Sequence, residues 1–252
     1  MPKKNTNARK DTLYGGDVGE KFSFNEQVVS VFDDMISRSV PFYKQTLDLC
    51  VEFITLHLHG LAGQGVKDLR VYDIGCSNGN LLIGLSQKLR GLASALIGID
   101  NSQAMVQSAT LKAKAYNTDI TFQCNDCLKE ELLQCNVVVS NYTLQFIRPP
   151  FRTQLIKKIY NALESGGIFI MSEKMASIDT VFDSQMITLY HNYKAQNGYS
   201  QTQIAKKREA LENVLVPYSL EENIALIKEG GFKSVEVLFK WVNFGTIIAR
   251  KD

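Results

Sequence analysis

The fold of this chain is decided by the stretch Leu69-Arg-Val-Tyr-Asp-Ile-Gly-Cys-Ser-Asn-Gly-Asn80. An apolar run carries Asp73 near its end and is followed by a turn with two glycines, Gly75 and Gly79, and then by a helical pattern. Glycine lets a backbone approach a ligand closely, and the first N–H groups of the following helix point toward whatever binds there. The stretch therefore predicts a strand, a turn and a helix that hold a nucleoside.

A second apolar run, 95–99, ends in Asp100, which is where Rossmann-type folds place the acid that binds a ribose. The glycine spacing alone also occurs in simple tight turns. A nicotinamide dinucleotide site needs Gly-x-Gly-x-x-Gly around a pyrophosphate, whereas this turn has Cys76 and Ser77 in its middle and Asp73 before it. Two acids repel a pyrophosphate but tolerate the cationic S-adenosylmethionine, whose ribose hydroxyls donate hydrogen bonds. The pattern favours S-adenosylmethionine.

The composition, with 45% hydrophobic and 21% charged residues, is that of a soluble enzyme, and 252 residues suffice for one large α/β domain with additions. No apolar run approaches a bilayer span and the N-terminus has no signal-peptide core, so we expect a cytoplasmic protein without a membrane partner. A net charge of +2 gives no broad electrostatic footprint, so no direct nucleic-acid binding is expected. Five cysteines, an odd number, fit reduced thiols.

A basic leader, residues 1–20, is expected to be disordered and to precede a single domain, residues 21–252. Two helices are predicted at 25–35 and 42–58, and a loop at 60–65 leads into the first strand. From there strands and helices alternate, which is typical of βαβ units in a parallel sheet. The predicted strands are 69–74, 95–99, 120–124, 136–140 and 167–172, and the helices between them are 79–89, 103–115, 128–133 and 150–163.

A helical insertion, about 176–216, interrupts this alternation. Its two predicted helices cover about 179–195 and 201–214, and Ser200 with Gln203 forms a capping box for the second. A last helix, 220–229, precedes two β-patterned runs that form a hairpin, 234–240 and 243–249. This order resembles the class I methyltransferase fold, an α/β Rossmann-like fold whose mostly parallel seven-stranded sheet ends in an antiparallel hairpin.

Polar residues follow two further strands of the predicted sheet. Asn125 and Asp126 come after the third strand and Asn141 after the fourth, and ligands bind at these carboxyl ends in open α/β sheets. Asn and Asp also begin ordinary loops, but together with the two strand-end acids they favour a site. We expect Asn125-Asp126 to accept from the adenine amine and Asn141 to face the reactive end of the cofactor.

Two other patterns argue against competing chemistry. Enzymes that methylate amines usually carry Asn/Asp-Pro-Pro-Tyr/Phe after the fourth strand, whereas residues 141–146 read Asn-Tyr-Thr-Leu-Gln-Phe, which disfavours methyl transfer to a base amine. Cys124 and Cys127 have the Cys-x-x-Cys spacing, but no second pair stands at zinc spacing, and His57 and His59 are isolated. We expect no metal.

Beyond the general class I methyltransferase fold, several segments resemble the carboxy-S-adenosyl-L-methionine synthase family. This resemblance runs over almost the whole chain from Asp11. The Arg-Ser-Val-Pro piece of the first segment and the Asn-Gly-Tyr-Ser segment lie outside the generic methyltransferase motifs. The matching segments are Val31-Phe-Asp-Asp-Met-Ile-Ser-Arg-Ser-Val-Pro41, Gly98-Ile-Asp-Asn-Ser102, Asn141-Tyr-Thr-Leu-Gln-Phe146, Ser172-Glu-Lys174, Asn197-Gly-Tyr-Ser200 and Leu211-Glu-Asn-Val214.

The resemblance implies a transferase that moves the carboxyl group of prephenate onto the methyl carbon of S-adenosylmethionine, releasing phenylpyruvate and water. The product, carboxy-S-adenosyl-L-methionine, serves a second enzyme that carboxymethylates the hydroxylated wobble uridine of certain tRNAs. In that family a sulfonium ylide captures the carbon dioxide lost as prephenate aromatises. The resemblance also implies a homodimer, with the inserted helices as the place where subunits meet.

Carried over by motif, the family's catalytic positions fall on Arg208 and Tyr43. A planar guanidinium holds a carboxylate by two parallel hydrogen bonds, which ordinary methyl transfer does not need. The structural alternative for Arg208 is a surface ion pair with Glu212, one helical turn later. The implied cofactor-binding positions are Tyr43, Gly75, Cys76, Ser77, Asp100, Asn101, Asp126, Cys127, Asn141 and Arg208.

His191 and Lys194 on the inserted helix are candidates to bind the dianionic prephenate, although a lysine at a helix C-terminus also complements the helix dipole. No side chain is marked as the base that takes the methyl proton. Two other functions remain open from the sequence. One is an ordinary S-adenosylmethionine-dependent methyltransferase of small molecules, and the other is a noncatalytic binding partner of a tRNA-modifying enzyme.

Overall fold

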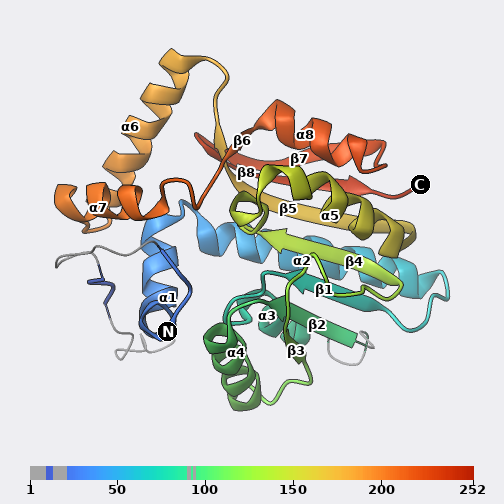
Figure 1. Cartoon of the computed structure of the whole chain (residues 1–252). Coiled ribbons are helices and arrows are strands. Elements are labelled where there is room, and N and C mark those ends of the chain that lie inside the picture. The colour runs from blue at the N-terminus through green and yellow to red at the C-terminus, as the bar shows by residue number, and fades with distance from the viewer. Residues whose placement is uncertain (1–9, 14–21, 90–91, 93–94) are drawn as a thin grey trace.

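The computed structural model describes residues 10–13, 22–89, 92 and 95–252. Most of the predicted leader, residues 1–9 and 14–20, lies outside the described residues. The rest forms a central sheet with helices on both sides and a pair of helices beyond one end of the sheet (Figure 1).

The sheet has the strand order β3-β2-β1-β4-β5-β8-β7, with the two-residue β6 paired to the end of β5. The first five strands are parallel, and β8 runs antiparallel between β5 and β7, which confirms the predicted sheet and its C-terminal hairpin. Strand β6 is an addition that the sequence did not indicate. The strands are β1 Arg70–Ile74, β2 Ala95–Asp100, β3 Thr121–Cys124, β4 Cys135–Asn141, β5 Leu163–Ala176, β6 Tyr218–Ser219, β7 Ser234–Trp241 and β8 Phe244–Arg250.

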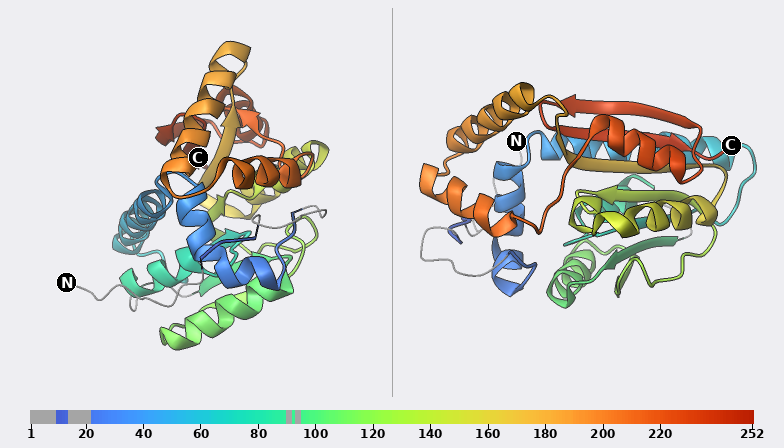
Figure 2. Two further views of the ribbon diagram at one scale, coloured as in Figure 1. Left: turned by 90° about the vertical axis from the view of Figure 1, so that its left-hand side faces the viewer. Right: turned by 45° about the horizontal axis from the view of Figure 1, so that its top comes forward.

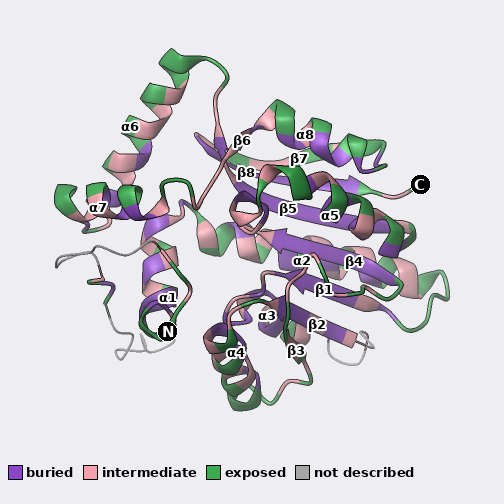
Figure 3. Cartoon of the chain, in the orientation of Figure 1, coloured by how far each residue is buried: buried purple, intermediate pink, exposed green. Residues whose placement is uncertain are grey.

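Both faces of the sheet are buried, so the central strands are continuously apolar instead of alternating (Figure 3). In β4, Val137 and Val139 pack on one side with helices α2 (Tyr43–Gly63) and α3 (Asn80–Lys88). Val138 packs on the other side with α5 (Pro149–Ala162) and α8 (Leu220–Glu229). The side chains alternate because successive residues of a strand point to opposite faces.

Three further helices lie near the carboxyl ends of the parallel strands. Helix α1 (Glu26–Ser39) packs through a separate apolar cluster that includes Met105 of α4 (Gln103–Ala115). Helices α6 (Thr180–Gln196) and α7 (Gln201–Leu211) form the predicted insertion and project beyond the sheet, with α1 beside α7 (Figures 1 and 2). The predicted capping box is present at the start of α7, where the Ser200 hydroxyl accepts the N–H of Gln203 and the Gln203 side chain accepts the N–H of Ser200.

The helix predicted near 128–133 is wrong, because this segment forms a turn and an extended loop. The Asp126 side chain accepts the N–H of Leu128 at 2.9 Å, which starts a turn. The Lys158 ammonium group on α5 then donates to the carbonyl oxygens of Cys127 and Leu128 at 2.9 and 3.0 Å, and to that of Glu130. A helix would need those carbonyl oxygens for its own hydrogen bonds.

Other predicted boundaries also change. Helix α1 continues to Ser39 instead of ending at 35, and β5 covers Leu163–Ala176 instead of 167–172. Helix α2 continues through Gly60 to Gly63 instead of ending at Leu58, and α7 ends at Leu211 instead of 214. Each glycine inside a helix costs about 1 kcal/mol relative to alanine. Burial of Leu61 against the α2 and α3 side of the core offsets that cost.

A buried polar cluster joins α1, the turn between α6 and α7, and the segment around Asp11. We call Asp11, Arg38, Ser39, Tyr199 and Lys207 the Asp11 cluster. Asp11 is only 2% exposed, and its carboxylate accepts the Tyr199 hydroxyl at 2.5 Å and faces the Lys207 ammonium group at 3.9 Å. Lys207 also donates to the Ser39 hydroxyl at 2.9 Å. The guanidinium of Arg38 lies 4.3 Å from the centre of the Tyr199 ring and donates to the Asp11 carbonyl oxygen.

The cluster brings together two of the segments that carry the family resemblance. Arg38 and Ser39 belong to the Arg-Ser-Val-Pro segment, and Tyr199 belongs to the Asn-Gly-Tyr-Ser segment. The two segments are far apart in sequence and meet in one set of buried hydrogen bonds. Their shared task is to dock the inserted helices on α1.

We predict that Asp11→Ala lowers the free energy of unfolding by about 3 kcal/mol or more, because it removes a buried carboxylate that faces a lysine. Equilibrium unfolding in guanidinium chloride measures the change. The matched control is Asp48→Ala, which breaks the exposed ion pair with Lys44 in α2 and should cost less than about 1 kcal/mol. Equal losses in the two variants would contradict a stabilising role for the Asp11 cluster.

Candidate functional site

A cavity of about 1090 Å³ opens at the carboxyl ends of β1, β2 and β4 and extends to α1, α6 and α7. It is larger than most single-ligand pockets, which span roughly 300–1,000 Å³. Among the lining residues are eight of the ten predicted cofactor-binding positions, namely Gly75, Ser77, Asp100, Asn101, Asp126, Cys127, Asn141 and Arg208. The structure thus brings together most of the positions that the sequence indicated.

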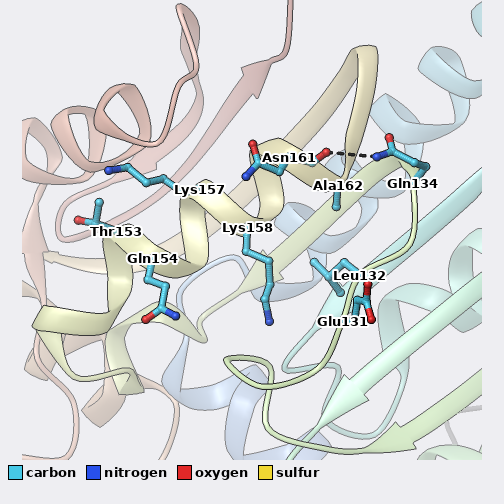
Figure 4. A pocket seen from close by; sticks show the side chains of 9 residues that line it. All are labelled: Glu131, Leu132, Gln134, Thr153, Gln154, Lys157, Lys158, Asn161 and Ala162. Carbon is cyan, nitrogen blue, oxygen red and sulfur yellow. Dashed lines mark hydrogen bonds between the residues drawn. The ribbon is translucent and has the colours of Figure 1, made fainter.

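A second, more open cavity of about 650 Å³ lies between α5 and the loop before β4 (Figure 4). Gln134 directly precedes β4, so this hollow lies at the amino end of that strand. Lys158 points from α5 toward the loop that carries Glu131 and Leu132. Because open α/β sheets bind ligands at the carboxyl ends of their strands, we assign the functional site to the larger cavity.

The turn after β1 leaves no room for a side chain at Gly75. Its φ is +73°, and an added Cβ would lie 2.1 Å from the Thr143 hydroxyl oxygen. The N–H groups of Gly75 and Cys76 both donate to the carbonyl oxygen of Ile99, at 2.7 and 3.1 Å. The turn is therefore held against the end of β2 and against the loop that follows β4.

Asp100 is positioned by the backbone on either side of it. One carboxylate oxygen accepts the N–H of Ser77 at 2.9 Å, and the other accepts the N–H of Ser102 at 2.9 Å. Each oxygen keeps a further lone pair for a ligand hydroxyl. Burial raises the pKa of Asp100, and the two N–H donors oppose that rise. This geometry suits a carboxylate that accepts hydrogen bonds from a ribose.

Asp73 lies behind the same turn and is 3% exposed. Burial, and then the nearby Asp100 carboxylate, raise the pKa of Asp73 to about 7. A cation bound at the turn would stabilise the ionised form. The electrostatics therefore fit the positively charged S-adenosylmethionine and disfavour a pyrophosphate.

Asn141 gives a separate test of whether the cavity fits S-adenosylmethionine. Its side-chain oxygen is buried at the cavity and has no hydrogen-bond partner in the part of the chain that the structure describes. Leaving a buried acceptor unpaired costs about 1–3 kcal/mol. A ligand that donates an N–H group at this point, such as the amino group of S-adenosylmethionine, would satisfy it.

Tyr43 and Cys76 lie behind the cavity wall and do not line it. The Tyr43 ring centre is 6.3 Å from that of Tyr142, which does line the cavity, and the Tyr43 hydroxyl accepts from the Asn80 amide at 3.5 Å. Burial raises the pKa of Tyr43 to about 12, so its hydroxyl remains protonated at neutral pH. In the described conformation Tyr43 supports the cavity wall and does not contact the cavity itself.

The far end of the cavity is lined by basic side chains. Arg208 on α7 is exposed and, among the described residues, forms no ion pair or hydrogen bond, so the alternative pair with Glu212 is absent. Lys194 and His191 of α6 line the cavity, as does Lys174 of β5. Lys174 was not predicted, although it stands in the Ser172-Glu-Lys174 segment that carries part of the family resemblance.

A buried carboxylate supports the loop after β4, of which Thr143 and Gln145 line the cavity. Glu173 accepts the N–H groups of Thr143 and Leu144 on one oxygen, at 3.2 and 2.9 Å, and that of Gln145 on the other, at 2.8 Å. These bonds fix the 3₁₀ turn η1 (Leu144–Phe146) that follows β4. Burial raises the pKa of Glu173 to about 8, against the effect of the three N–H donors. Sequence reasoning did not assign this role to Glu173.

Gln145 connects this turn to the insertion and to β5. Its side-chain oxygen accepts the N–H of Lys174 at 2.9 Å, and its backbone carbonyl oxygen accepts the N–H of Val216 at 2.8 Å. The buried Arg152 guanidinium donates to the carbonyl oxygens of Ile147 and Val216, at 2.8 and 2.7 Å. The segment that follows α7 is therefore held by hydrogen bonds at the end of β4.

No group of three or more His, Cys, Asp or Glu side chains that would hold a metal ion is found among the described residues. Cys124 and Cys127 are free thiols. Of the described helices, none is long and apolar enough to cross a membrane.

Comparison with known proteins supports the methyltransferase fold. A family model described as a methyltransferase domain matches residues 71–167. Two solved structures share the fold over most of this chain. The magnesium protoporphyrin IX methyltransferase of Synechocystis, solved with bound S-adenosylhomocysteine, gives a TM-score of 0.57 at 17% identity, covering 95% of this chain and 92% of that one. Human N-acetylserotonin methyltransferase, solved with S-adenosylmethionine, gives 0.58 at 16% identity, covering 97% and 63%.

Curated relatives are much closer in sequence. The carboxy-S-adenosyl-L-methionine synthase of Helicobacter hepaticus is 54% identical, covering 96% of this chain and 100% of the relative. The proteins of the same name from Nitratiruptor and from Helicobacter pylori strain HPAG1 are 46% and 47% identical, covering 96% of this chain and 98% and 99% of those proteins. With the acids at the strand ends and the class I methyltransferase sheet, these relatives show that the chain is a transferase that uses S-adenosylmethionine and belongs to the carboxy-S-adenosyl-L-methionine synthase family.

Proposed function

We propose that this protein transfers the carboxyl group of prephenate to the methyl carbon of S-adenosylmethionine, giving carboxy-S-adenosyl-L-methionine, phenylpyruvate and water. The observation that carries the proposal is the placement of Arg208. Its guanidinium has no partner among the described residues and lines the same cavity as the ribose-binding acid Asp100. A bidentate cation beside a methyl-donor site suits a product that carries an extra carboxylate.

The proposed reaction balances without a further reactant. The bond between the prephenate ring and its carboxyl carbon breaks, and the electron pair moves into the ring as the ring hydroxyl departs. The S-adenosylmethionine methyl carbon loses a proton and forms a new bond to the carbon dioxide released. The methyl proton and the departing hydroxide make water, and the aromatised ring leaves as phenylpyruvate.

The described residues divide this work between two ends of the cavity. Asp100 and Asp126 hold the ribose and adenine of the methyl donor, and Asn141 accepts from its amino group. Arg208 holds the carboxylate that is transferred, next to the methyl carbon. Closing the two substrates in one cavity keeps water from the reactive carbon.

We further propose that the protein is a homodimer that meets its second copy through α6. One side of this helix and the residues before it are apolar and more than half exposed, at Ile178, Val181, Phe182 and Leu189. Val181, Phe182 and Leu189 lie on one face of α6 by their spacing, and an apolar face of this kind suits burial against a second copy. The family resemblance supports the same assembly.

The proposed product would be consumed by a tRNA carboxymethyltransferase that modifies the hydroxylated wobble uridine. That role follows from the family resemblance. It would place the reaction in the cytoplasm, with tRNA as a substrate of the second enzyme and not of this one.

Mass spectrometry of the nucleoside product tests the reaction. Purified protein incubated with S-adenosylmethionine should give a species with one added carboxyl group only when prephenate is present. Arg208→Ala should lower its rate of formation roughly 100-fold, because a charge-assisted pair is lost, whereas the exposed control Arg250→Ala should not. Unchanged S-adenosylmethionine in both tubes would reject the proposal in favour of an ordinary methyltransferase or a noncatalytic binding partner.

The raised pKa of Asp73 predicts how S-adenosylmethionine affinity depends on pH. In the free protein Asp73 is protonated below its pKa of about 7, and a bound cation favours the ionised carboxylate. Affinity should therefore rise as the pH increases from 6 to 8. Calorimetric titration of wild type against Asp73→Asn isolates this contribution, because the variant loses it while the ligand's own titration stays the same. Parallel profiles for the two proteins would count against the prediction.

The assembly is tested by light scattering after size-exclusion chromatography. Phe182→Glu should convert the dimer to a monomer, because it places a charge in the proposed interface. Leu111→Glu is the matched control, since Leu111 is an exposed apolar residue on α4. A Phe182→Glu variant with the wild-type mass would exclude the α6 interface.

A further inference from the structure

Two lysine side chains of the cavity, Lys174 and Lys194, lie against one aromatic ring. The Lys194 ammonium group is 4.4 Å from the centre of the Tyr190 ring, and the Lys174 ammonium group is 5.2 Å from the same centre. Lys174 comes from the end of β5 and Lys194 from the last turn of α6. Two separate elements therefore bring their cations to one point of the cavity wall.

These cations have no matching anion in the described part of the chain. Lys194 is only 4% exposed, yet its ammonium group makes no hydrogen bond or ion pair with any described residue. Burial, and then the nearby Lys207 and Lys174 ammonium groups, lower the pKa of Lys194 to about 7. Burial also lowers the pKa of Lys174, and Asp183, which opposes that shift, lies beyond ion-pair distance. A bound anion would relieve this repulsion.

The aromatic surroundings suit the rest of a ring-bearing ligand. The Tyr190 ring centre lies 5.0 Å from that of Phe244, and the Phe244 ring centre lies 6.3 Å from that of Tyr142. All three side chains line the cavity. They form an apolar wall between the lysines and the turn after β1, where a six-membered ring can pack.

We propose that Lys174 and Lys194 form a second carboxylate subsite, which binds the carboxylate that the leaving aryl 2-oxo acid keeps. Arg208, on a different helix, then binds only the carboxylate that is transferred. The inference rests on the proposed function, in which the carboxyl donor has two carboxylates and loses one. It assigns to each carboxylate its own cationic group.

Two binding measurements separate the subsites without requiring turnover. The first titrates phenylpyruvate into protein saturated with S-adenosylhomocysteine, and the second titrates carboxy-S-adenosyl-L-methionine into the free protein. Lys194→Met and Lys174→Met should weaken phenylpyruvate binding roughly tenfold or more and leave carboxy-S-adenosyl-L-methionine binding near that of wild type. Arg208→Ala should show the opposite pattern. Lys228→Met, an exposed change on α8, should alter neither.

The outcomes distinguish failure of the subsite from failure of the proposed reaction. The subsite is overturned if wild type does not bind phenylpyruvate, or if the two lysine variants bind it as wild type does. The proposed reaction fails by the separate observation that wild type makes no carboxylated product from prephenate. Lys174 is only half-buried, so Lys174→Met keeps the test available if Lys194→Met does not fold. S-adenosylhomocysteine affinity reports whether each variant is folded.

Discussion

The three hydrogen bonds that the buried Glu173 carboxylate accepts are the constraint on which the rest of the site depends. They fix the loop that follows Asn141 and its η1 turn, and Thr143 of that loop occupies the space that a side chain at Gly75 would need. The same turn presents Gln145, whose contacts hold Lys174 and the chain returning from α7. Through these contacts a single carboxylate helps to hold the cofactor turn, the end of β5 and the insertion together around the cavity.

The insertion turns a general methyl-donor fold into a cavity with opposite charges at its two ends. Acids at the ends of β1 and β2 suit a cationic sulfonium compound, while α6, α7 and β5 contribute lysine and arginine side chains. Lys207 points into the Asp11 cluster, and the next residue, Arg208, lies at the cavity. The cluster that docks the insertion therefore also sets the position of the Arg208 guanidinium. Helix α7 therefore carries both a docking residue, Lys207, and the residue proposed to bind the transferred carboxylate, Arg208.

Apolar periodicity predicted the order of strands and helices, since it reflects burial on both faces of the sheet, and the strand-end acids indicated the cavity. Features that depend on distant residues were not predictable in the same way. The turn at 128–133 is held by Lys158 of a later helix, and β6 forms only because the chain returns beside the end of β5. Neither the burial of Lys194 nor its convergence with Lys174 has a local signal, because both depend on how α6 lies relative to the end of β5.

The meeting of Arg38, Ser39 and Tyr199 in the Asp11 cluster has a consequence for how this chain can diverge. Ser39 and Tyr199 are far apart in sequence but share a hydrogen bond, and Lys207 also donates to Ser39. A substitution in one segment alone would therefore leave a buried polar group without its hydrogen-bond partner. Chimeras that exchange 38–41 with a distant relative would have to exchange 197–200 as well. The two segments form a single structural unit, although most of the cofactor-binding domain lies between them.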